Sequence, residues 1–501
     1  MSVGIKSWLR QAMRLASCGA AVAVLSLGVA QAKDAAVTSV PGKPALLLGT
    51  FDVKDLGYDV NEFFVSGEAV SYAMEGRPPE DGRWTATPAN TAPYKTRIVV
   101  LRPTDPHKFN GTVVVEWLNV SGGVDGAADW FMAHREMVRS GMAYVGVSAQ
   151  KVGVDGGPSM MGIDNSLKKT DPVRYGSLSH PGDAFAYDIY TQAGRLVRAA
   201  RPGGLLGPLT PKHIIAMGES QSAAFMTTYV NAVDPLAKVY DGFLIHSRGS
   251  GVAPLGGSSL FGGGPDSRPQ KVKLRADLRV PVITFITETD LIGIRGPGFY
   301  AARQPDTEHL RIWEVPGTSH ADNYTIQVSM IDTGSAPLEK LAAAYAPTAS
   351  LMGTQLPKTI NFAPQHHYVL EAALWSLDRW VSSGHAPPKA PAIELTSTDP
   401  PAAVRDGNGL AVGGIRTPWV DVPAARLSGL PTTTTNVMAV LFGTSEPFDA
   451  ATLAKLYPGG KVEYLKRFEA SLDSSIKAGF ILPTDKREIL GLAALMYPGA
   501  N

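Results

Sequence analysis

One short segment constrains the fold of this chain more than any other. Residues His213–Gly218 (HIIAMG) predict a strand, the sequence GESQS follows at 218–222, and Gln221–Val233 predict a helix. Where a strand turns sharply into a helix, small residues are needed two positions before and after the central residue, because strand and helix approach closely. Gly218 fits, and a serine stands where the second glycine is usual. The pattern predicts that Ser220 presents its hydroxyl above the edge of a sheet.

Two later predicted strands end in groups that complement a serine. Pro281–Thr287 (PVITFIT) runs into Glu288-Thr289-Asp290, and Leu310–Val315 (LRIWEV) runs into a turn that ends at His320. The carboxyl ends of parallel strands meet at one edge of a sheet. The order Ser, Asp, His along the chain is also that of one family of catalytic triads. We therefore expect the three groups to converge.

These residue types suggest a division of labour. A serine hydroxyl is a poor nucleophile at neutral pH and needs a neighbouring base. We expect His320 to take the Ser220 proton and pass it to the leaving group, while Asp290 holds the His320 tautomer and stabilises the imidazolium. Glu288 is the alternative acid; Asp290 is preferred because its spacing after the strand fits the usual turn. Each motif is weak alone, but together they predict a serine hydrolase triad.

A tetrahedral intermediate also needs two N–H donors for its oxyanion. The backbone N–H of Gln221, at the start of the predicted helix, is one candidate. The second is expected in the loop after the strand Thr112–Val120, where Val120 N–H is the candidate and Asn119 and Ser121 are its neighbours. Asn119 and Trp117 are also candidates for contact with the substrate, although the default interpretation of a tryptophan is core packing.

Four stretches together resemble a known family. They are Glu116–Gly123 (EWLNVSGG), Gly218–Ser222, Glu288–Asp290 and Gly413–Pro418 (GGIRTP), the last followed by an Asp-Val-Pro sequence. From about residue 45 onward the chain resembles the bacterial proteins called "alpha/beta hydrolase domain" proteins. The resemblance implies an α/β-hydrolase fold, with a mostly parallel central sheet flanked by helices, and an ester hydrolase without a defined substrate. Within the last stretch, Arg416 is a candidate for binding an anionic group or a structural residue of the tail.

Strand-like and helix-like runs alternate through the middle of the chain, as in a mostly parallel sheet covered by helices. Besides those above, the runs lie at Tyr94–Leu101, Ala127–Ser140, Met142–Ser148, Asp183–Ala200, Tyr240–His246 and His367–Ser382.

The pattern divides the chain into a hydrolase domain and a tail. The domain spans residues 33–385, with insertions at 247–279 and 321–365 that are expected to roof the site, because long loops are often functional lids. A proline-rich linker at 386–403 leads to an extension at 404–501, whose apolar content predicts that it packs on the domain.

The first 32 residues predict an export signal. Three basic residues and no acidic ones precede an apolar run from Gly19 to Ala30, and Ala30-Gln31-Ala32 is a small-x-small cleavage pattern. Cleavage after Ala32 predicts a periplasmic or secreted protein. A lipoprotein is the alternative, but Cys18 precedes the apolar run. That run is short for a membrane span, which needs about 20 residues.

Charge and residue counts limit the partners. Lys plus Arg number 46 and Asp plus Glu 45, a balance that argues against nucleic-acid binding. With one cysteine, no intramolecular disulfide can form. His366 and His367 have Glu371 nearby but no third ligand at a suitable spacing, so neither a metal nor another cofactor is predicted. The expected partner is a small-molecule ester.

Two alternatives stay open at this stage. An amidase, lactonase or acyltransferase would use the same triad and differ in its leaving group or acceptor. A binding protein that has lost catalysis on a hydrolase scaffold would keep the fold with triad side chains too far apart to bond.

Overall fold

The computed structural model describes residues 35–257, 260, 269–293, 296–398, 401–436 and 438–498. The predicted signal peptide at 1–32 lies outside the described residues, and so does part of the predicted insertion at 247–279.

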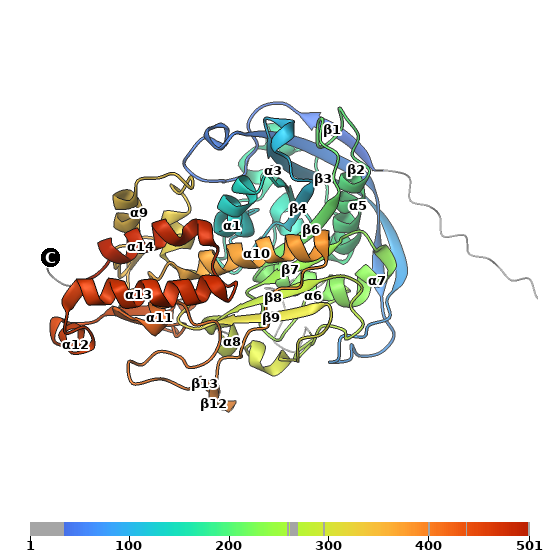
Figure 1. Ribbon diagram of the computed structural model, residues 1–501. Coiled ribbons are helices and arrows are strands. Elements are labelled where there is room, and N and C mark those ends of the chain that lie inside the picture. The colour runs from blue at the N-terminus through green and yellow to red at the C-terminus, as the bar shows by residue number, and fades with distance from the viewer. Residues whose placement is uncertain are drawn as a thin grey trace, which may run out of the picture. The chain divides into compact units, whose positions relative to one another are not determined.

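Within the described residues, nine strands form the central sheet in the order β1-β2-β3-β5-β4-β6-β7-β8-β9 (Figure 1). The pairs β1–β2, β2–β3 and β3–β5 are antiparallel, whereas β5, β4 and β6 to β9 are mutually parallel. The strands are β1 (Ala36–Val40), β2 (Tyr58–Ala73), β3 (Thr87–Pro103), β4 (Thr112–Trp117), β5 (Ala143–Val147), β6 (His213–Glu219), β7 (Gly242–His246), β8 (Val282–Thr287) and β9 (Leu310–Val315). The predicted mostly parallel sheet is confirmed.

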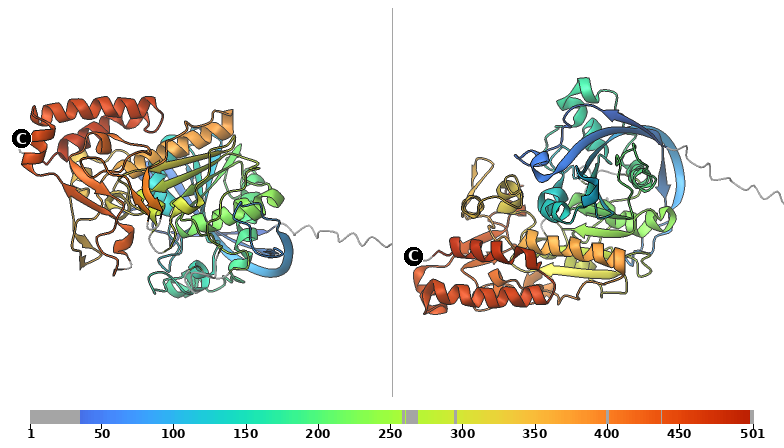
Figure 2. Two further views of the ribbon diagram at one scale, coloured as in Figure 1. Left: turned by 90° about the horizontal axis from the view of Figure 1, so that it is seen from below. Right: turned by 45° about the horizontal axis from the view of Figure 1, so that its top comes forward.

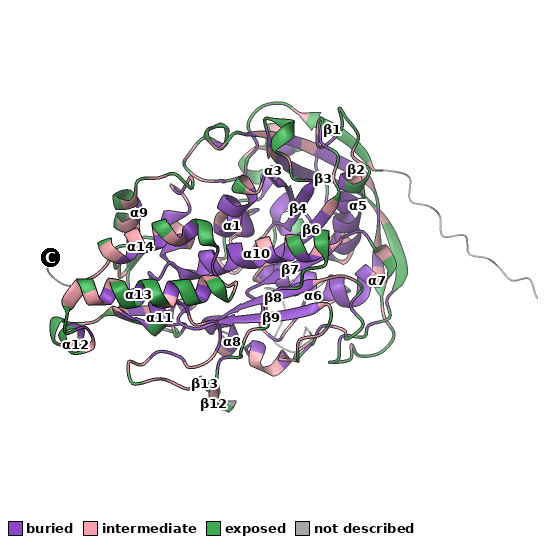
Figure 3. Ribbon diagram, in the orientation of Figure 1, coloured by how far each residue is buried: buried purple, intermediate pink, exposed green. Residues whose placement is uncertain are grey.

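Helices cover both faces of the sheet. Alternation along β4 places Val114 in one apolar core with side chains of α1 (Ala128–Arg139) and α10 (Gln365–Ser383). Val113 and Val115 lie in the other core, with side chains of α5 (Ala186–Arg198) and α6 (Gln221–Thr228). Because both faces are covered, the central strands are rich in apolar residues, and Figure 3 shows them as largely buried.

The amino-terminal half of the sheet is larger than the sequence analysis predicted. β2 pairs with β3 over a register that runs from Tyr58 opposite Pro103 to Ala73 opposite Thr87. β2 was not predicted, and β3 begins seven residues before the predicted strand at Tyr94–Leu101. Only part of each strand is buried, so their apolar signal is diluted by polar residues.

The last hundred residues share a core with α10. Phe468 and Leu472 of α13 (Gly460–Lys477) and Leu492 of α14 (Lys486–Leu495) belong to the same apolar cluster as Leu374 of α10. Figures 1 and 2 show these two helices beside α10.

Ion pairs also join the carboxyl-terminal extension to α1. Arg139 contacts Asp485 at 2.5 Å, and Arg135 contacts Glu488 at 2.5 Å. All four side chains are at least three-quarters buried, so these pairs lie in a region of reduced solvent screening.

The segment predicted as a linker at 386–403 is fastened to β9. The indole N–H of Trp313 donates to the Pro388 carbonyl at 3.1 Å, and Arg311 Nε donates to the Pro387 carbonyl at 2.9 Å. Further on, Ile393 N–H donates to Glu314 at 2.8 Å. This segment is therefore held along the edge strand rather than spanning a gap.

The remaining elements are short. They are α2 (Lys151–Asp155), α3 (Leu167–Thr170), α4 (Pro172–Tyr175), α7 (Asp234–Ala237), α8 (Glu288–Ile292), α9 (Leu338–Ala344), α11 (Pro418–Asp421), α12 (Ala450–Leu456), β10 (Ser350–Leu351), β11 (Thr354–Gln355), β12 (Leu395–Thr398), β13 (Pro401–Ala403), β14 (Ala425–Ser428) and β15 (Thr444–Pro447). Of the helices in the described residues, none has the length and apolar character that crossing a bilayer requires.

Candidate active site

Ser220 lies at the turn between β6 and α6 in a strained conformation. Its φ is 58° and its ψ is −113°, a region that a non-glycine residue enters at a cost of about 1–3 kcal/mol. The Ser220 N–H donates to the His246 carbonyl of β7 at 2.9 Å, which ties the turn to the next strand. A Cβ added at Gly218 would lie 3.2 Å from the Ser222 carbonyl, so strand and helix do approach closely here.

Asp290 and His320 form a direct pair. Asp290 lies in α8, immediately after β8, and its Oδ1 is 2.6 Å from His320 Nδ1. Burial raises the pKa of Asp290, but the charge of His320 and hydrogen bonds from His320 and Thr287 outweigh that effect and lower it below its usual value. Asp290 is thus a carboxylate that orients the imidazole through Nδ1.

The other nitrogen of His320 faces a second carboxylate. Nε2 lies 3.2 Å from Glu219 Oε1, and Glu219 is the residue immediately before Ser220. Burial alone would lower the pKa of His320, but the charges of Asp290 and Glu219 raise it to about 9. In the part of the chain that the structure describes, no hydrogen bond joins Ser220 Oγ to His320; both residues line the same cavity.

The sequence analysis assigned no role to Glu219 and so missed this residue. Asn119 Nδ2 donates to its Oε2 and to its backbone carbonyl, each at 3.0 Å. Burial raises the pKa of Glu219 to about 8, and the His320 charge opposes that rise. A charged residue beside the candidate nucleophile was the signal that could have identified it.

A cavity of about 250 Å³ opens beside these groups. Its walls are mainly apolar and come from segments far apart in the chain. Among the lining residues are Ser220, His320, Phe131, Met132, Met160, Met161, Ala321, Thr325, Ile326, Met438, Leu441 and Phe442. The predicted insertion at 321–365 contributes to this wall, and the carboxyl-terminal extension contributes as well. The described residues of the insertion at 247–279 do not.

The two predicted oxyanion donors differ in availability. Gln221 is the first residue of α6, where a backbone N–H has no partner within the helix. Val120 N–H donates to the Gln221 side chain at 3.3 Å, and that side chain donates in turn to Gln150 at 2.7 Å. Ser121 N–H is also taken, by Asn119 Oδ1 at 2.8 Å. In this arrangement, Val120 N–H is occupied by another partner.

Glu288, the alternative acid, faces away from His320. Its carboxylate accepts hydrogen bonds from Arg405 at 2.6 Å, from Gly429 N–H at 3.0 Å and from Gly317 N–H at 2.9 Å. These partners occupy both oxygens, so Glu288 holds the carboxyl-terminal extension and is not the acid paired with His320.

Trp117 and Arg416 also lie outside the cavity lining. Trp117 is fully buried, packs on Tyr190 and Phe225, and donates to Gln150 at 3.0 Å, so it belongs to the core beneath α5 and α6. Arg416 Nε contacts Asp421 at 2.6 Å, and its other nitrogens bond groups of the same tail. Arg416 is therefore a structural residue of the tail here.

A second, buried polar cluster adjoins the site, and its central residue, His246, also lines the cavity. His246 Nδ1 is 2.9 Å from Asp129, and His246 Nε2 is 2.8 Å from His366 Nε2. Burial and the nearby His366 place the pKa of His246 well below its usual value, so the ring is neutral. Among the described residues, no group of three or more His, Cys, Asp or Glu side chains could hold a metal ion.

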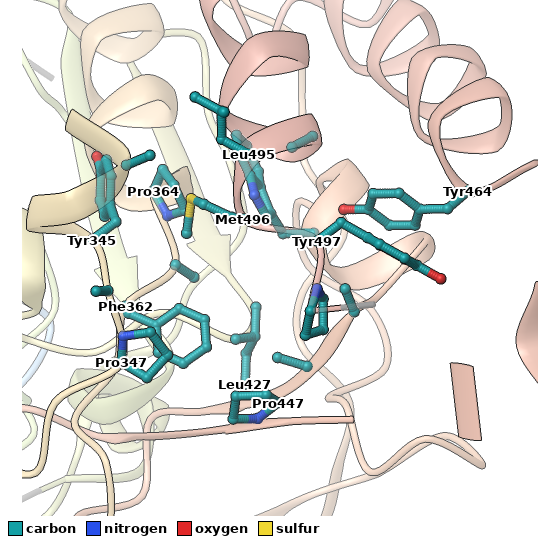
Figure 4. A pocket seen from close by; sticks show the side chains of 18 residues that line it. Tyr345, Pro347, Phe362, Pro364, Leu427, Pro447, Tyr464, Leu495, Met496 and Tyr497 are labelled. Atoms are coloured by element: carbon teal, nitrogen blue, oxygen red, sulfur yellow. The ribbon is translucent and has the colours of Figure 1, made fainter. Parts of the chain in front are cut away.

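Another cavity, of about 310 Å³, lies between residues 342–364 of the predicted insertion and the carboxyl-terminal extension (Figure 4). Tyr345, Phe362, Leu427, Met496 and Tyr497 are among the side chains around it, and none of the candidate triad residues lines it.

Comparisons with known proteins place the chain in a family. The model of the alpha/beta hydrolase domain family matches residues 28–491. No curated protein matches the chain. Similar solved structures include an α/β serine hydrolase without a lid from Xanthomonas campestris, with 13% identity and a TM-score of 0.27 over 50% of this chain and 85% of that one. A thermostable esterase from Pseudomonas putida has 12% identity and a TM-score of 0.26 over 50% of this chain and 74% of that one. The chain belongs to the alpha/beta hydrolase domain family and has the α/β-hydrolase fold.

Proposed function

We propose that this protein is a serine hydrolase that cleaves carboxylic esters through an acyl-enzyme. The observation that carries the proposal is the Asp290–His320 pair, which meets the strained Ser220 turn at one apolar cavity. A strained residue at a cavity wall is favoured where the chemistry needs an exposed nucleophile.

The steps follow from the positions of these groups. His320 Nε2 turns toward Ser220, which lines the same cavity, while the ring stays beside Glu219. Ser220 Oγ then attacks the ester carbonyl carbon while its proton moves to Nε2. The tetrahedral intermediate collapses, the C–O bond to the alcohol breaks, and Nε2 returns the proton to the leaving oxygen. A water molecule repeats the sequence on the acyl-enzyme and releases the acid.

The oxyanion would be bound at the start of α6. Gln221 N–H is one donor, supported by the positive end of the helix dipole. The second is proposed to be Gly122 N–H, because Gly122 lines the cavity and its N–H has no hydrogen bond within the described residues. Val120 N–H, the donor expected from the sequence, would first have to exchange its bond to Gln221.

The cavity favours an uncharged acyl group. Methionine and phenylalanine side chains supply much of the apolar wall, and a carboxylate or ammonium group buried against them would lose its hydration without a partner. Flexible methionines also adapt to ligands of different shape.

The test is the Ser220→Ala variant. We expect kcat on p-nitrophenyl esters to fall by at least about 10³-fold, and labelling by a fluorophosphonate probe to disappear. Ser222→Ala is the matched control, since Ser222 is buried two residues further on and its hydroxyl has no hydrogen-bond partner; this variant should still be labelled. Unchanged turnover by Ser220→Ala would exclude the proposal. Anilides and lactones in the same assay separate an esterase from an amidase or lactonase.

A further inference from the structure

The imidazole of His320 lies between two carboxylates rather than one. Asp290 is 2.6 Å from Nδ1, as a triad requires, and Glu219 is 3.2 Å from Nε2. Nε2 is the atom that has to receive the Ser220 proton. Glu219 therefore occupies the side of the ring on which the reaction takes place.

Glu219 is fixed in this position from two directions. It is the last residue of β6, so its backbone belongs to the sheet. Asn119, in the loop after β4, donates from one amide group to both the Glu219 carboxylate and the Glu219 carbonyl. The side chain is only 12% exposed, so water competes weakly with its contact to His320.

Other ionisable groups packed around this pair come from three elements. After burial, which is the largest cause and which the His320 charge opposes, Asp129 of α1 and Asp290 of α8 help to raise the pKa of Glu219; burial also raises the pKa of Asp129 itself well above its usual value. His246 of β7 is buried and neutral, as described above, so it adds no charge. The positive charge that best compensates this group of acids is a proton on His320.

We propose, building on the serine hydrolase function above, that Glu219 is a positioning residue whose carboxylate pairs with the imidazolium form of His320 during the reaction. When Ser220 Oγ bonds to the acyl carbon, its proton moves to Nε2 and the ring becomes positive. Glu219 stabilises that charge until the proton passes to the leaving alkoxide. The same pairing keeps Nε2 protonated in the free enzyme, so the base becomes available only at higher pH.

The decisive variant is Glu219→Gln, which removes the charge and keeps an oxygen that Asn119 can bond. We expect the acid limb of the kcat/KM profile on a p-nitrophenyl ester to move about 1–2 pH units lower, because an opposite charge at this distance shifts a pKa by that amount. The plateau should fall, since the imidazolium loses a stabilising partner. A role limited to folding would lower activity at every pH without moving the limb.

Two comparisons make the result specific. Glu314→Gln removes a buried carboxylate from β9 that pairs with Arg303, away from the imidazole, and should leave the limb in place. Glu219→Asp keeps the charge and should shift the limb less than Glu219→Gln.

NMR titration of the His320 ring without substrate is a measurement that does not depend on activity. The His320 signal is identified as the one that disappears in His320→Asn. The pH midpoint of this titration should be lower in Glu219→Gln than in the wild type. An unchanged midpoint together with an unchanged limb overturns the proposal. If Ser220→Ala kept its activity, the hydrolase function would fail, while the NMR midpoint would still decide the pairing of Glu219 with His320.

Discussion

Two carboxylates of α8 stand two residues apart and serve different regions of the molecule. Asp290 pairs with His320, which lines the cavity, whereas Glu288 faces the carboxyl-terminal extension and binds Arg405 and Gly429. Successive residues of a helix are about 100° apart, so side chains at i and i+2 point to nearly opposite sides. About half a turn of helix therefore separates the carboxylate that pairs with His320 from the carboxylate that binds the extension.

The comparison shows that the hydrogen-bond partners around a carboxylate decide its role. Glu288 accepts N–H donors from the extension and also from Gly317, which belongs to the turn that carries His320. Asp290 contacts that same turn from the cavity side through the imidazole. The extension and the candidate triad are thus joined through one short helix, and substitutions on its two sides should separate activity from stability.

The largest effect is expected from Asp290→Asn. The amide cannot stabilise the imidazolium and favours the wrong tautomer of His320, so kcat should fall by about 10³–10⁴-fold. Stability should change little, because the side chain keeps its size and its contact with Thr287. Ester turnover and a thermal unfolding curve check both parts, and a loss of less than tenfold would contradict the assignment.

Glu288→Gln should show the opposite behaviour. Arg405 and two backbone N–H groups would lose a charged acceptor in a buried position, at a cost of about 2–3 kcal/mol in the free energy of unfolding. While the protein is folded, kcat should stay within about tenfold of the wild type. Urea denaturation measures the first quantity. If activity were lost with full stability, the division between the two sides of α8 would be wrong.

The smallest effect is expected from Arg416→Ala. Its guanidinium is partly exposed and bonds only groups of the tail, so its loss should cost about 1 kcal/mol. KM for neutral and anionic esters should stay the same in the variant. A rise in KM confined to anionic esters would instead return Arg416 to the substrate site.

The sequence predicted the parts of the site that depend on local pattern. The turn at Ser220, and the carboxylate and histidine after β8 and β9, follow strands that are rich in apolar residues, as strands of a parallel sheet are. The same reasoning missed β2, because a strand with one solvent-facing side mixes polar and apolar residues. The family matched by the chain and its fold agree with the resemblance seen in the motifs.

What the sequence could not predict depends on contacts between distant segments. Choosing between Glu288 and Asp290 requires knowing that Arg405 and Gly429 lie against one side of α8. Trp117 was a candidate for substrate contact. Alternation along β4 instead turns its side chain to the face of the sheet that packs on α5 and α6.

The wall that Met438, Leu441 and Phe442 add to the candidate cavity predicts that the carboxyl-terminal extension takes part in substrate selection. A chain shortened before this region would lose one side of its binding surface along with the helices behind it. If this stretch were exchanged between two relatives, we expect acyl preference and the packing of the extension to change together.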